Sequence, residues 1–184
     1  MANIDQRVFF NDLWEWFGQV APTIEKARTL KGGGGFEQWA VIEFLRWQTA
    51  KRGPDLNYRR EYTAAKGLKR RFDVAYNCPD VAPPGKDDPV MLTQWKCGNT
   101  ANSVSMEIQK DIGTFSEALG TGLGTAPQPQ LGSDYVEPFI IAFSPEPLIS
   151  QSMWVGPAVA GTALLLQIST DATLAAYGIS PKRV

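Results

Sequence analysis

The sequence predicts an α/β protein, a three-layer sandwich in which a central mixed β-sheet of about five strands is flanked by helices. Apolar residues at helical spacing occur both before and after a set of short segments that alternate or are uniformly apolar. The chain has 184 residues, of which 43% are hydrophobic, and this suits one domain with a continuous core. No internal repeat with a period of about 20–50 residues occurs, which argues against solenoids and propellers.

Two helical regions are expected before the first strand. Residues 5–20 place apolar side chains at helical spacing, and a second short helix is expected from Pro22 to about residue 30, because proline is favoured in the first turn of a helix. Four consecutive glycines at 32–35 then interrupt regular structure. Residues 36–49 resume the helical pattern, and a Gly-Pro pair ends it.

The expected strands are residues 56–62, 71–77, 89–97, 135–143 and 163–169. The first two alternate in polarity and are joined by a link that contains glycine, so they are predicted to form a hairpin. The fourth is apolar on both faces apart from Glu137, which predicts a central strand. Residues 104–119 carry an amphipathic pattern that predicts a helix between the third and fourth strands. A short helix or turn is expected near Thr173.

The chain contains no histidine. Catalysis by Ser-His-Asp or Cys-His groups needs an imidazole, so both classes are excluded, as are zinc sites with histidine ligands. Cys78 and Cys97 are expected to be reduced thiols, although a disulfide between them stays open because sequence gives no distance. Any enzymatic chemistry must therefore use mainly carboxylates, lysine, tyrosine or water.

Charge is distributed unevenly, although the formal net charge is −1. Residues 46–71 hold nine of the 18 basic side chains and only two acids, and residues 111–181 hold no Lys or Arg. This pattern is typical of a nucleic-acid-binding face, with a solvated hairpin rich in Lys and Arg as the alternative. No apolar run reaches about 18 residues and the N-terminus lacks the layout of a signal peptide, so a cytoplasmic protein without a membrane partner is expected.

An aspartate lies in the middle of an apolar strand. Asp73 sits between Phe72 and Val74, and the following strand carries Gln94 and Lys96 on one side. Desolvating such a carboxylate costs several kcal/mol unless Lys96 or a divalent cation neutralises it. Hydrolysis of a phosphodiester uses this combination, in which oxygen ligands hold a hard cation and an ammonium group lies beside the attacking water. The alternative is a buried ion pair in a domain without catalytic activity.

Asp73 followed by Gln94-Trp95-Lys96 resembles the PD-(D/E)XK nuclease superfamily, which has the restriction-endonuclease-like fold, in its Mrr-like D…QxK variant. The resemblance implies a metal-dependent endonuclease that hydrolyses DNA phosphodiester bonds with Mg²⁺, for which Mn²⁺ can substitute. The competing hypothesis is a non-catalytic nucleic-acid-binding or protein-interaction module with a degenerate nuclease fold.

The resemblance covers only the middle of the chain. A single domain is expected over residues 1–184. Within it, residues 1–31 form an N-terminal helical segment, residues 33–143 form the nuclease-like core, and residues 144–184 form a C-terminal strand and extension.

The resemblance also implies roles for individual residues. Asp73 would be the central metal ligand, Gln94 would contribute its side-chain oxygen where most relatives have an acid, and Lys96 would position or activate water. Glu37, at a Gly-Phe-Glu helix start, would be the helical acid of the site, with Glu43 as the alternative. Because glutamine replaces an acid, the implied metal site has one negative charge less, which weakens cation binding.

Basic residues beside the expected hairpin are candidates for contacts with DNA phosphates. They are Arg59, Arg60, Lys69, Arg70, Arg71 and Lys110. The resemblance also implies that Gln109 and Lys110 fall on the crossing helix where relatives place auxiliary polar residues. The expected partner is DNA. A homodimer stays open, because cutting both strands of a duplex favours two copies.

Overall fold

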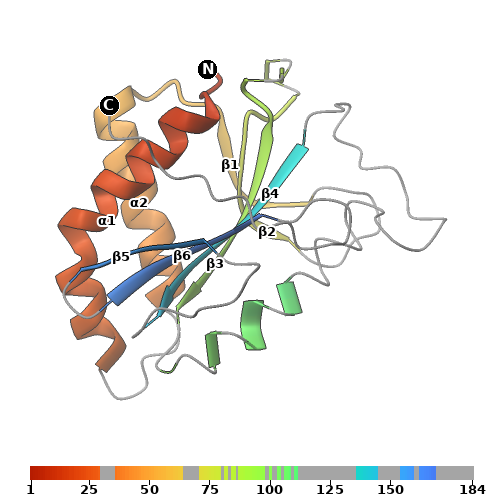
Figure 1. Ribbon diagram of the computed structural model, residues 1–184. Coiled ribbons are helices and arrows are strands. Elements are labelled where there is room, and N and C mark those ends of the chain that lie inside the picture. Colours follow the sequence, from red (N-terminus) through yellow and green to blue (C-terminus); the bar gives the residue numbers. More distant parts are fainter. Residues whose placement is uncertain are drawn as a thin grey trace.

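The computed structural model describes residues 1–29, 36–63, 71–79, 81–82, 84–85, 87–97, 100, 103–104, 106–108, 110–111, 136–144, 154–159 and 162–168. Within these residues two helices precede six strands (Figure 1). The elements are α1 (Gln6–Thr29), α2 (Phe36–Arg52), β1 (Tyr58–Tyr62), β2 (Phe72–Tyr76), β3 (Val90–Cys97), β4 (Val136–Ser144), β5 (Trp154–Val159) and β6 (Thr162–Ile168).

The six described strands form one mixed sheet in the order β1-β2-β3-β4-β6-β5. β3 and β4 are parallel, whereas every other neighbouring pair is antiparallel. A parallel pair needs a connection that crosses the sheet, and helical turns within residues 103–111 belong to it. The α/β class and the central position of β4 are therefore confirmed, and the sheet has six strands where about five were predicted.

β5 is the strand that the sequence pattern did not predict. It contains Gly156 and Pro157, which weaken a strand and remove a backbone donor, respectively. The structure accommodates both residues at the edge of the sheet, where the register shifts between Val155 and Ala158. Edges and bulges tolerate proline because some N–H groups there have no ladder partner.

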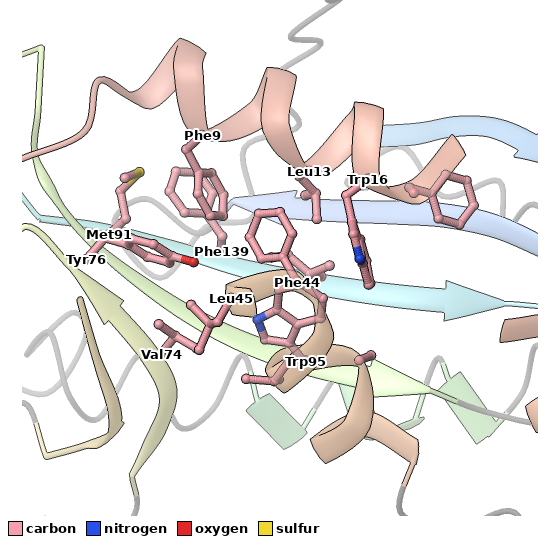
Figure 2. Close-up of a cluster of buried hydrophobic side chains, with 14 of the residues drawn as sticks. Phe9, Leu13, Trp16, Phe44, Leu45, Val74, Tyr76, Met91, Trp95 and Phe139 are labelled. Atoms are coloured by element: carbon pink, nitrogen blue, oxygen red, sulfur yellow. The ribbon is translucent and has the colours of Figure 1, made fainter. Parts of the chain in front are cut away.

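Both long helices pack on one face of the sheet, where they enclose a core rich in aromatic rings (Figure 2). The ring centroid of Phe44 on α2 lies 5.3 Å from that of Trp16 on α1 and 5.5 Å from that of Trp95 on β3. Such pairs contribute about 0.5–1.5 kcal/mol each beyond the burial of area. Because Trp95 faces the helices, the side chains of Gln94 and Lys96 emerge on the opposite face of the strand.

α1 is one continuous helix, so the prediction of two separate helices that divide before Pro22 is wrong. Ala21 and Ile24 are fully buried, which means that the packed face of the helix continues past the proline. Pro22 itself is exposed, as is Gly18, whose carbonyl loses its helical partner. Water can supply that missing hydrogen bond, so packing outweighs the local penalty.

No disulfide joins the two cysteines. Cys78 follows β2 and Cys97 ends β3, and these strands are antiparallel, so the two thiols lie at opposite ends of the strand pair.

Several sequence predictions fall on residues outside the described ranges. They are the glycine run at 32–35, the hairpin link at 64–69, the second half of the helix predicted at 104–119 and the turn near Thr173. Among the described residues, neither α1 nor α2 combines the length and apolar character that crossing a membrane requires.

Candidate functional site

The candidate site lies where β2 and β3 separate. Backbone pairing between the two strands joins Val74–Tyr76 to Met91–Thr93. Beyond the Val74–Thr93 pair, hydrogen bonds between backbone and side chains connect the two strands. The Asp73 N–H donates to Gln94 Oε1 at 3.3 Å, and the Trp95 N–H donates to Asp73 Oδ2 at 2.7 Å. Two of the side chains predicted to be functional therefore bridge the separating strands.

The Gln94 amide takes the place of a peptide group between these strands. Its Nε2 donates to the backbone oxygen of Arg71 at 3.0 Å, while its Oε1 accepts from the Asp73 N–H. A carbonyl oxygen has two lone pairs, so Oε1 can still accept a second donor or contact a cation. An ionised glutamate could not donate to Arg71, which gives a structural reason for glutamine at position 94.

Asp73 is a largely buried carboxylate that its neighbours neutralise only in part. Burial is the main effect and raises its pKa, while the hydrogen bond from the Trp95 N–H and the charge of Lys96 lower it. Glu37 and Glu61 raise it further, and the pKa of Asp73 is about 6. Burial is therefore the main reason that the charged form of Asp73 is destabilised, and the nearby acids add to it.

Lys96 lies between two carboxylates. Its Nζ is 3.2 Å from Asp111 Oδ2 and 4.0 Å from Glu37 Oε2. Glu37 also accepts a hydrogen bond from the Cys97 N–H at 3.2 Å, which joins the first turn of α2 to the end of β3. Burial lowers the pKa of Lys96, but the charges of Asp111 and Glu37 outweigh it and raise the pKa overall, so the ammonium stays protonated.

Glu43, the alternative to Glu37, lies away from the site. It forms an ion pair with Arg46 at 2.6 Å on the outer side of α2, and this hydrogen-bonded guanidinium lowers the pKa of Glu43. At about 100° per residue, six positions place the two glutamates on different faces of the helix. The structure thus brings Glu37, and not Glu43, beside Lys96.

The predicted phosphate-binding residues do not share one face. Arg59 of β1 pairs with Ala75, so by register it lies on the same side of the sheet as Asp73. Arg60 lies on the side of the helices, where it donates to Gln38 Oε1 of α2 at 3.2 Å. Only the first of these two arginines is therefore positioned near the candidate site.

The remaining basic candidates are divided between described and undescribed parts of the chain. Arg71 is exposed and directly precedes β2. Lys110 forms an exposed ion pair with Glu107. Lys69 and Arg70 lie outside the described residues, as does Gln109, the predicted auxiliary polar residue.

Glu61 is a site residue that was not predicted from the sequence. It falls between the β1 residues that pair with Phe72 and Val74, so it lies opposite Asp73. Its φ of 51° is a left-handed backbone conformation that is unusual for a residue with a side chain. Like charges at opposite positions of neighbouring strands destabilise a sheet, which adds to the excess of negative charge.

Asp111 is the second unpredicted site residue. It follows the buried residues Val104 and Ile108 at helical spacing, so it continues the packed stripe of the segment between β3 and β4. A charged residue on an otherwise apolar stripe is the signal that could have identified it.

The oxygen atoms at this site suit a hard cation by charge and by type. Asp73, Glu37 and Gln94 offer oxygen ligands, which Mg²⁺ and Mn²⁺ prefer. In the part of the chain that the structure describes, no three Cys, His, Asp or Glu side chains form a metal-binding group by themselves. Coordination would therefore have to be completed by the Gln94 oxygen and by water, which Mg²⁺ commonly retains.

Neither a protein-family model, nor a curated protein, nor a solved structure matches this chain. Its function is therefore inferred from the geometry of the site. That geometry places Asp73, Gln94, Lys96 and Glu37 on three adjoining elements, β2, β3 and α2.

Proposed function

We propose that the protein is a metal-dependent endonuclease that hydrolyses DNA, with the Asp73 region as its active site. The proposal includes the finer assignment of the fold, a restriction-endonuclease-like three-layer sandwich of the Mrr-like PD-(D/E)XK branch. The observation that supports it best is the incompletely neutralised carboxylate of Asp73 where β2 and β3 separate, with Lys96 and Glu37 close by. A divalent cation would supply the missing positive charge.

Each side chain has a role that follows from its contacts. Asp73, Gln94 and Glu37 would hold Mg²⁺, or Mn²⁺ in its place, and the ion would polarise the scissile phosphate and acidify a bound water. The Trp95 N–H fixes the orientation of the Asp73 carboxylate. Lys96 remains protonated, so it orients the attacking water or a phosphate oxygen by donating hydrogen bonds and does not accept a proton.

Basic residues on the same side of the sheet would position the DNA. Arg59 lies on the Asp73 side by register, and Arg71 is exposed two residues before Asp73. Contacts from such residues to phosphates give affinity that falls steeply with salt concentration and carries no sequence information.

One observation favours a second candidate function, a nucleic-acid-binding module without catalytic activity. Both ends of the Gln94 amide already hydrogen bond to the backbone of β2, which is what a purely structural glutamine would do. Calorimetric titration with Mg²⁺ or Mn²⁺ separates the two proposals, because the nuclease requires saturable binding that depends on Asp73 and the module does not.

The proposed function is tested with supercoiled plasmid DNA, incubated with Mg²⁺ or with a chelator. We expect the wild-type protein to nick or linearise the plasmid only when Mg²⁺ is present. Asp73→Ala and Lys96→Ala should abolish cleavage while circular dichroism shows an intact fold. Cleavage retained by either purified variant would refute the assignment.

Two glutamates of α2 provide a matched control. Glu37→Gln should reduce cleavage strongly, because it removes one of the two acids beside Lys96, whereas Glu43→Gln removes an acid that pairs with Arg46 on the outer side of the helix. Equal activity of these two variants would show that the site does not include the first turn of α2.

A further inference from the structure

Asp111 lies in the segment that crosses the sheet between β3 and β4. The helical turns of this segment, green in Figure 1, lie on the opposite side of the sheet from α1 and α2. Val104 and Ile108 of the same segment are 1% exposed, and Asp111 is 8% exposed. A carboxylate buried on an apolar stripe must contact a compensating charge, since its desolvation is unfavourable.

The compensating charge is Lys96. The distance from Lys96 Nζ to Asp111 Oδ2 is 3.2 Å, compared with 4.0 Å to Glu37 Oε2, so Asp111 is the nearer of the two acids. The lysine side chain is only 15% exposed, which limits screening of this contact by water. Burial raises the pKa of Asp111, and the nearby Lys96 ammonium opposes that rise.

A lysine side chain needs an anchor if its ammonium is to have a fixed position. Lysine carries a point charge on a flexible stem of four carbons, and it lacks the rigid fork with which arginine fixes its own geometry. The contact with Glu37 is at the limit of an ion pair, and that carboxylate also accepts from the Cys97 N–H. Asp111 is thus the residue best placed to fix Lys96.

We propose that Asp111 is a positioning residue, which holds the Lys96 ammonium at the Asp73 site and couples that site to docking of the crossing segment on the sheet. This inference rests on the proposed nuclease function. Asp111 acts through Lys96 and is not itself a metal ligand. Removing its charge should therefore impair turnover without weakening the binding of the cation or of DNA.

The test compares Asp111→Asn and Asp111→Glu with the wild-type protein and with Glu107→Gln as a matched control. Glu107 lies on the same helical segment, but its carboxylate is exposed and pairs with Lys110. For each protein, kcat and KM are measured on a labelled DNA duplex, Mg²⁺ binding is measured by calorimetry, and the melting temperature is recorded.

We expect Asp111→Asn to lower kcat by about 10- to 100-fold, the range typical of residues that orient a functional group, with KM and Mg²⁺ affinity nearly unchanged. Asp111→Glu should recover part of the lost kcat, and Glu107→Gln should match the wild type. A kcat of Asp111→Asn equal to that of the wild type overturns the inference, as does a variant that loses Mg²⁺ binding together with kcat.

A readout independent of cleavage is NMR of the Lys96 Hε protons in metal-free protein. A fixed ammonium gives separate resonances for the paired Hε protons, and we expect these to merge in Asp111→Asn but not in Glu107→Gln. Unchanged Lys96 signals in a folded Asp111→Asn variant overturn the inference. If Asp111→Asn does not fold, the Lys96 Hε signals of Asp111→Glu are compared with those of the wild type. A smaller separation of the paired signals supports the inference, and an unchanged separation overturns it.

Failure of the proposed function gives a different result from failure of this inference. A wild-type protein that neither binds Mg²⁺ nor cleaves DNA refutes the nuclease and, with it, any catalytic role of Asp111. A wild-type protein that cleaves DNA as well as its Asp111→Asn variant refutes only the role of Asp111.

Discussion

Two buried aspartates of this protein have opposite surroundings. Asp12 on α1 is fully buried, and it accepts hydrogen bonds from Arg52 at 2.6 and 2.9 Å and from Gln48 at 3.1 Å, with Lys51 Nζ also 3.1 Å away. Burial alone would raise its pKa, but these donors together lower it. Asp73, in contrast, has one backbone donor and shares Lys96 with other acids, and its pKa is raised to about 6.

The difference separates a carboxylate that is satisfied within the protein from one that we propose is functional. The Asp12 network joins α1 to α2 and extends through Gln48 to the hydroxyl of Tyr76 on β2, so its charge and its hydrogen bonds are satisfied within the protein. The charge of Asp73, in contrast, stays destabilised by burial despite the Trp95 N–H and the nearby Lys96. Strongly perturbed carboxylates of this second kind cluster at functional sites.

The largest expected effect on stability comes from breaking the Asp12 network. Asp12→Ala leaves Arg52, Lys51 and Gln48 without their buried acceptor, and removing one partner of a buried pair costs about 3–5 kcal/mol. Because both cations are about a third exposed, the lower end of that range is expected. Urea unfolding followed by tryptophan fluorescence measures the change.

Glu15→Gln is the control for this variant. Glu15 also pairs with Lys51, but its side chain is 54% exposed, and exposed pairs contribute at most about 1 kcal/mol. Comparable losses from Asp12→Ala and Glu15→Gln would contradict the view that burial makes the Asp12 network structural.

The next largest effect has the opposite sign. Asp73→Asn removes a charge that is destabilised by burial, while its side-chain oxygen can still accept from the Trp95 N–H. In metal-free buffer at pH 7.5 the variant should therefore be more stable than the wild type, by up to about 3 kcal/mol at 1.36 kcal/mol per pKa unit. A variant less stable than the wild type at this pH would show that Asp73 is structural.

The pH dependence of this gain follows from the direction of the shift. Because the pKa of Asp73 rises from 3.8 to about 6 on folding, the folded protein binds more protons than the unfolded chain between these values. The contribution of Asp73 to stability thus falls as pH rises through this interval. Above it, the ionised carboxylate destabilises the folded protein to its full extent. The advantage of Asp73→Asn should shrink as pH is lowered from 7.5 toward 4, measured by urea unfolding across that range.

Gln94→Glu should have a smaller effect on stability, and it also tests whether Gln94 contributes to a cation site. An ionised glutamate cannot donate to the Arg71 carbonyl, so the metal-free protein should lose about 1 kcal/mol. The added charge should tighten Mg²⁺ binding. Calorimetry and thermal melting, each with and without Mg²⁺, measure both changes, and Mg²⁺ affinity that stays the same or weakens would place Gln94 outside the cation site.

The smallest predicted effect concerns the two faces of β1. Arg59→Ala should weaken binding to any DNA sequence and reduce the salt dependence by about one phosphate contact, whereas Arg60→Ala should change neither. The reason is that Arg59 lies on the Asp73 side by register and Arg60 contacts Gln38 on the helix side. Fluorescence anisotropy at several salt concentrations distinguishes this outcome from equal effects of both arginines.

The sequence was sufficient to predict the elements whose periodicity matches their burial. The alternation through Asp73 and from Leu92 to Lys96 identified the strands and the shared face of their polar residues, and the structure brings Asp73 and Gln94 into contact. The prediction that the first helix ends before Pro22 was wrong. Proline disfavours the interior of a helix, but tertiary packing stabilises α1 on both sides of Pro22.

Long-range placement was harder to predict than local structure. Glu37 and Glu43 both lie on α2, and only the position of its first turn against β3 separates them. Glu61 and Asp111 approach the site through strand register and through the crossing segment, so no local motif contains them. Such contacts depend on how distant segments dock, which periodicity does not encode.

Calorimetric titration of metal-free protein with Mn²⁺ shows whether a divalent cation balances the buried charge of Asp73. The wild-type protein is predicted to show saturable binding at one site per chain, and Asp73→Asn, although folded and more stable, is predicted to show none. Equal binding by the two proteins, or no binding by either, would show that Asp73 does not hold a cation.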